Sequence, residues 1–61
     1  MDILVGRTLS DQDILNNSNV VVVDENFVKD YLKVSDEESL GMDILISDQY
    51  FTIVGVAKPH A

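Results

Sequence analysis

Apolar and polar residues alternate in blocks along the chain, and the clearest blocks lie in its last third. Two segments rich in apolar residues, 43–47 and 50–57, flank the polar pair Asp48-Gln49. Apolar segments on both sides of a short polar turn are typical of a β-hairpin. Because Asp-Gln is a poorer pair for a tight turn than Asp-Gly, a slightly longer loop is also compatible with this segment.

Two more apolar runs predict strands earlier in the chain. Val20 to Val23 are four consecutive β-branched residues without polar alternation. Such a run predicts a strand that is buried on both faces and lies in the centre of its sheet. The shorter run Ile3 to Val5 ends at Gly6 and predicts an edge strand.

The segment after the valine run predicts the main helix, from about residue 25 to residue 33. Asp24 is suited to be its N-cap, and the acidic residues precede the lysines, which complements the helix dipole. Glu25 lies four residues before Lys29, which favours an ion pair. The apolar stripe of this helix consists of Phe27, Val28, Tyr31 and Leu32.

Two shorter helical turns are predicted by their capping pairs. Ser10 with Asp13 and Ser35 with Glu38 both have the spacing of a capping box. Together the elements predict an α+β fold: a small mixed β-sheet with one main amphipathic helix packed on one face and a C-terminal β-hairpin. Residues 1–58 are expected to form a single small domain, and residues 59–61 a tail.

Three glycines mark positions where the backbone is constrained. Gly6 and Gly41 follow or precede apolar runs and are expected in turn or cap conformations. Gly55 lies inside a predicted strand, which indicates a bulge or the close approach of another backbone segment. The three are too far apart to form a phosphate-binding loop.

The net charge of the chain argues against two classes of binding partner. Eleven acidic and four basic residues give a net charge of −7, and the basic residues do not cluster, so nucleic acid and anionic lipid are not expected as partners. A chain of this length buries only about 60% of its unfolded surface. It has no cysteine for a disulfide, so a partner surface is expected to stabilise it. No apolar run is long enough to span a bilayer and no signal peptide is visible, so the residues alone indicate a cytosolic protein.

None of the candidate sites assembles a recognisable chemistry. Asp11-Gln12-Asp13 begins like a calcium loop, but its fifth and twelfth positions are Leu15 and Val22, so helix capping is preferred. Arg7 is expected to pair with Asp11 or Asp13.

The remaining acidic cluster and the single histidine also lack partners. Asp36 to Glu38 is interpreted as a solvated helix start, and His60 as a tail residue without a second zinc ligand or a nucleophile. We therefore expect no catalytic residue, no metal site and no cofactor.

The order of these features nevertheless resembles a known family. The features that carry the resemblance are Gly6-Arg7, Asp13, Val20 to Val23, Phe27 to Leu32, Leu40-Gly41, Ile44 with Ile46, and Phe51 through Val56. In this order they resemble the extracytoplasmic (periplasmic) core domain of MacB-like and FtsX-like ABC transporter permeases, and more narrowly its small α/β subdomain. The linker 34–39 departs from the pattern because it is more acidic and slightly longer than the short step that usually joins the helix to the hairpin in this family.

The resemblance implies a non-catalytic fragment of a larger membrane permease. Its partners would be the remainder of the permease extracytoplasmic domain, a separate ATPase subunit or domain, and an external protein or peptide. The module would lie on the extracytoplasmic face of the membrane and be soluble as a fragment. The alternative is a free-standing acidic binding or regulatory protein that docks a basic partner.

The last strand suggests where such docking occurs. Phe51, Ile53 and Ala57 alternate with Tyr50, Val54 and Val56, so both faces of the strand are largely apolar. One helix and a few short turns cannot cover both faces of a small sheet, so part of one face is expected to remain exposed. The candidate docking surface comprises Tyr50, Phe51, Ile53, Val54 and Val56.

Overall fold

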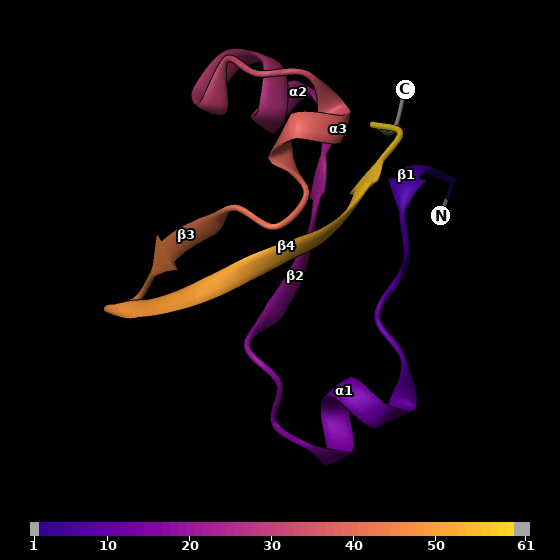
Figure 1. The fold of residues 1–61 in the computed structure, drawn as a ribbon, viewed down its shortest axis with the longest axis vertical. Helices are drawn as coiled ribbons and strands as arrows, with labels where there is room; N and C mark the ends of the chain where they lie inside the picture. Colours follow the sequence, from indigo (N-terminus) through magenta and orange to yellow (C-terminus); the bar gives the residue numbers. More distant parts are fainter. Residues whose placement is uncertain (1, 60–61) are drawn as a thin grey trace.

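The computed structural model describes residues 2–59, so His60 and the end of the expected tail lie outside the described residues. The elements are β1 (Ile3–Gly6), α1 (Asp11–Leu15), β2 (Val20–Asp24), α2 (Glu25–Phe27), η1 (Val28–Leu32), α3 (Asp36–Ser39), β3 (Asp43–Ile46) and β4 (Gln49–Ala57). The strands form one mixed sheet (Figure 1), with α2 and α3 near one end of the molecule and α1 at the other. The predicted α+β class is confirmed.

Strand β4 is the centre of this sheet. β2 pairs with it in parallel, and β1 and β3 pair with it in antiparallel orientation. Thr52 pairs with both Val20 of β2 and Asp43 of β3, so β2 and β3 flank opposite sides of β4. β1 lies on the same side as β3 and pairs with the C-terminal half of β4.

The predicted central position of the valine run is wrong. β2 pairs only with β4, and its four valines are half-buried. An unbroken apolar run reflects side chains that avoid water, but it does not determine how many strands lie beside the backbone. The nine-residue β4 takes the central position because it is long enough to pair with two strands along one side and a third along the other.

Gly55 allows β4 to pass under the loop that follows β1. Val21 pairs with Ile53 and Val22 with Gly55, so β4 contains one extra residue at this point, a β-bulge. A Cβ atom at Gly55 would overlap the carbonyl oxygen of Arg7. Both the bulge and the close backbone approach predicted for this glycine are therefore present.

The main helix begins and ends close to the predicted residues but widens in its second half. Asp24 Oδ1 accepts a hydrogen bond of 2.8 Å from the Phe27 N–H, which confirms the N-cap. The Lys33 N–H donates to the Val28 carbonyl at 2.7 Å, five residues back, so η1 is a π-helical turn. Lys33 then ends the helix with a left-handed backbone, φ 57°.

The apolar stripe of the helix is divided between core and surface. Val28 is fully buried, Phe27 is half-buried, and Tyr31 is 80% exposed although its ring stacks on Phe27 with 5.2 Å between ring centroids. Val28 shares the core with Ile53 and Val56 of β4. The anticipated Glu25–Lys29 ion pair does not form; within residues 2–59 the only ion pair joins Arg7 to Asp13.

The hairpin turn lies one residue earlier than predicted. Ser47 and Asp48 are its two central residues, and Ile46 pairs with Gln49, which already belongs to β4. Both central residues have positive φ, 51° and 65°. This is the type I′ geometry that matches the twist of a two-residue hairpin.

Candidate docking surface

Asp13, the second aspartate of the segment that begins like a calcium loop, stabilises the α1 turn through hydrogen bonds. Asp13 accepts hydrogen bonds from the Ser10 N–H at 2.9 Å and from Arg7 Nη1 at 2.8 Å, and Ser10 in turn caps the Asp13 N–H. The Arg7 guanidinium, followed by the Ser10 N–H, lowers the pKa of Asp13 to about 2. Of the two expected partners, Arg7 therefore selects Asp13, and this carboxylate stabilises the fold locally.

The second acidic cluster has a similar local role. Glu38 Oε1 accepts from the Ser35 N–H at 3.2 Å, and Ser35 Oγ accepts from the Glu38 N–H at 3.1 Å, which confirms the capping box. The buried Ser39 hydroxyl donates to the Asp36 carbonyl at 2.6 Å. Across residues 2–59, no group of three potential metal ligands converges.

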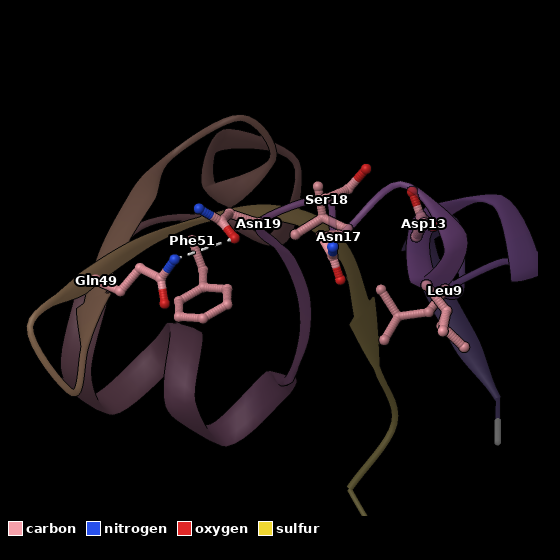
Figure 2. Close-up of a pocket in the computed structure, with 9 residues that line it drawn as sticks. Leu9, Asp13, Asn17, Ser18, Asn19, Gln49 and Phe51 are labelled. Carbon is pink, nitrogen blue, oxygen red and sulfur yellow. Dashed lines mark hydrogen bonds between the residues drawn. The ribbon is translucent and has the colours of Figure 1, made fainter.

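One hollow of mixed polarity lies between α1, the loop before β2 and the start of β4. Figure 2 shows Leu9 and Asp13 at one end of it, Gln49 and Phe51 at the other, and the loop residues between them. Gln49 Nε2 donates to Asn19 Oδ1 at 3.4 Å across this opening. The hollow offers amide groups and apolar side chains, while its one carboxylate is already held by Arg7.

The five residues of the candidate docking surface separate into three degrees of exposure. Tyr50 is 64% exposed, Phe51 and Val54 are half-buried, and Ile53 and Val56 lie in the core. In this chain only the first three can contribute accessible surface. The bulge at Gly55 changes the alternation after Ile53, which is why Val56 points to the same covered face as Ile53.

A larger apolar surface lies between the helix and the hairpin and was not predicted. It is a groove of about 490 Å³ lined by Val21, Val23, Phe27, Tyr31, Leu32, Ile44, Leu45 and Ile46. Tyr31, Leu45 and Ile46 are 80%, 58% and 42% exposed. The sequence does contain a signal: β3 reads Ile-Leu-Ile without polar alternation, so both of its faces are apolar.

Comparison with known proteins assigns the family. The family model described as the MacB-like periplasmic core domain matches residues 1–61. The chain belongs to this family. The resemblance seen in the order of Gly6-Arg7, the valine run and the hairpin is thereby confirmed.

A solved structure agrees with the family match. The crystal structure of the periplasmic region of MacB from Actinobacillus actinomycetemcomitans superposes with a TM-score of 0.84 at 26% sequence identity. The alignment covers 95% of this chain and 26% of the MacB chain, so residues 1–61 span about a quarter of that structure. A search of curated proteins finds no significant match. None of the helices within residues 2–59 has the length and apolar character needed to cross a membrane.

Proposed function

We propose that residues 1–58 form a non-catalytic subdomain of the extracytoplasmic region of an ABC transporter permease. In this proposal the subdomain docks against the remainder of that region or an external protein, and it moves as a unit during a transport cycle driven by a separate ATPase subunit or domain. The family match along the whole chain supports the transporter context.

The exposed apolar surface is the observation that carries the docking role. Tyr31, Leu45 and Tyr50 each expose more than half of their surface, in a chain of only 61 residues. Large apolar side chains that gather on one small module are typical of an interaction site. The groove and the hairpin present mainly apolar side chains, so binding and force transmission are the functions that this surface supports.

A cysteine-accessibility experiment tests this proposal, because the chain contains no natural cysteine. Leu45→Cys and Tyr50→Cys are prepared in the 61-residue chain and in the complete permease, whose other cysteines are replaced. We expect both thiols to react rapidly with a maleimide in the isolated chain and at least tenfold more slowly in the permease.

Glu37→Cys provides the matched control, since Glu37 is exposed on α3 and outside the apolar surface. Its thiol should react at similar rates in both proteins. Equal reactivity of Leu45→Cys and Tyr50→Cys in chain and permease contradicts the docking role. An open reading frame without transmembrane segments contradicts the permease assignment itself.

A further inference from the structure

Strand β2 has a free edge. It is the terminal strand of the order β1-β4-β2 and pairs with β4 alone. Among the backbone hydrogen bonds of residues 2–59 outside the regular elements, β2 contributes only that from the Val20 N–H to the Ser18 carbonyl. The edge that faces away from β4 therefore has no partner strand in this part of the chain.

The register identifies which backbone groups point outward. The Thr52 N–H donates to the Asn19 carbonyl at 2.9 Å, and Thr52 is the pairing partner of Val20. In a parallel ladder, every second residue of a strand bonds the same neighbouring strand. Because Asn19 bonds β4, Val21 and Val23 also direct their N–H and C=O groups toward β4. Val22 lies between them and directs both groups away from the sheet.

This edge lacks the features by which proteins block unwanted pairing. Exposed edge strands usually contain lysine, proline or a bulge. β2 instead has four valines before Asp24, and the bulge of this pair lies on β4. A run that resembles a central strand thus occupies an edge position with half-buried side chains.

We propose that a β-strand from the part of the periplasmic region outside residues 1–61 pairs with the free edge of β2 and makes it a central strand. This inference rests on the proposed function. The matched MacB region is almost four times as long as the aligned segment, so a larger region is available to supply the strand. Free N–H and C=O groups in strand geometry are satisfied in regular fashion only by another extended backbone.

The charge of the chain argues against a second copy as the occupant. Two chains that each have a net charge of −7 repel one another. The added strand should present apolar side chains beside the valines and no acidic residue near Asp24. Its backbone would satisfy the outward groups of Val22.

Amide hydrogen exchange tests the proposal directly. The Val22 and Val21 amides are compared in the 61-residue chain and in the complete periplasmic region encoded by the same gene. We expect the Val22 amide to exchange rapidly in the chain and at least tenfold more slowly in the complete region. The Val21 amide, which bonds to β4, should be protected in both proteins.

Every result other than the expected one overturns the proposal, and each identifies a different alternative. Rapid Val22 exchange in the complete region, with the Leu45→Cys thiol protected there, contradicts the strand pairing but leaves the docking role intact. Val22 protection that rises with the concentration of the isolated chain identifies a second copy as the occupant. Protection that requires an added second protein identifies an external partner, and a gene that encodes no further periplasmic region removes both proposals.

A pair of proline variants gives an independent measurement. Val22→Pro removes only the outward N–H, which an edge strand tolerates, whereas Val21→Pro removes a hydrogen bond to β4. We expect Val22→Pro to lower the denaturation midpoint of the complete region clearly more than that of the chain. Val21→Pro should lower both. Equal effects of Val22→Pro on the two proteins contradict the added strand.

Discussion

Gly55 lies where β4 passes directly beneath the backbone of Arg7, and a methyl group at this position would overlap the Arg7 carbonyl oxygen. We expect Gly55→Ala to lower the free energy of unfolding by about 3 kcal/mol, because backbone atoms cannot move aside as a flexible side chain does. Urea denaturation followed by circular dichroism measures the loss.

Gly41→Ala is the control for this substitution. No atom lies within 4 Å of a Cβ placed on Gly41, and only its positive φ of 88° opposes alanine. The expected cost is about 1 kcal/mol, the strain of a left-handed alanine. If the two variants lose the same stability, the close contact between Gly55 and Arg7 is not a significant constraint.

Asp13 should make the stability of the chain depend on acid. Its pKa in the folded state is about 2, lowered from 3.8 mainly by Arg7. Because the folded-state pKa lies below the unfolded value, the stabilisation is fully present above about pH 4 and is lost as the pH falls toward 2. Titration of the Asp13 carboxyl by NMR should show a midpoint near 2.

Arg7→Gln isolates the contribution of the ion pair to this titration. The midpoint of Asp13 should rise toward 3.8 but stay below it, since the Ser10 N–H still bonds to the carboxylate. The acid-dependent loss of stability between pH 4 and pH 2 should become shallower. An unchanged midpoint would mean that Arg7 does not hold Asp13 in solution.

At the scale of elements, the helix spanning α2 and η1 has one fully buried residue, Val28. Val28 is fully buried, whereas Tyr31 is 80% exposed. We expect Val28→Ala to cost about 2 kcal/mol through lost burial and the cavity that remains. Tyr31→Ala should cost less than about 1 kcal/mol, the loss of its stacking on Phe27. Thermal denaturation of both variants distinguishes the two sides of the helix, and a larger loss for Tyr31→Ala would contradict the observed orientation.

The hairpin turn offers a stabilising substitution. Asp48 has a φ of 65°, a conformation that costs most side chains about 1 kcal/mol and costs glycine little. Asp48→Gly should therefore raise the free energy of unfolding by about 0.5 to 1 kcal/mol. The reverse sign would indicate that the turn in solution is not the type I′ turn centred on Ser47 and Asp48.

Residues close together in the sequence predicted the helices and strands well. The order of the strands in the sheet depends on residues far apart and was not predicted. The N-cap at Asp24 and both capping boxes depend on residues three positions apart, which sequence spacing reveals directly. The edge position of β2 depends on its pairing with β4, whose partner residues lie 32 or 33 positions later, and nothing within the valine run reports it. The π-helical widening at Val28 likewise has no local signature, since its stripe fits an ordinary helix.

The exposure of the candidate docking surface was only partly predictable for the same reason. Two-sided apolarity drew attention to the hairpin, where Tyr50 is 64% exposed. The bulge at Gly55 could be anticipated, but its effect on which face Val56 takes depends on the register with β2. The groove between Tyr31 and Leu45 joins side chains from separate elements, so it becomes visible only once the helix is placed on the sheet.

For the whole molecule, the excess of acidic residues should make stability depend on ionic strength. A net charge of −7 on a chain of this size opposes compaction, and salt screens that repulsion. We expect the melting temperature to rise by several degrees between 20 mM and 500 mM sodium chloride. Calcium chloride at the same ionic strength should raise it equally, because residues 2–59 provide no cluster of metal ligands. A clearly larger rise with calcium would reveal a specific site.

The central place of β4 also has a consequence for the order in which the protein can fold as it is made. Every strand pair of the sheet includes β4, which comes after the other three strands in the sequence. During synthesis β1, β2 and β3 therefore leave the ribosome before β4, their shared partner within this chain, and the valine run cannot pair with β4 until residues 49–57 emerge. The capped helix after Asp24 is the one larger element that can form earlier from local interactions. A nascent chain whose residues 1–48 have emerged from the exit tunnel, but whose residues 49–57 have not, should thus be helical but sheetless, with its most aggregation-prone segment exposed to chaperones.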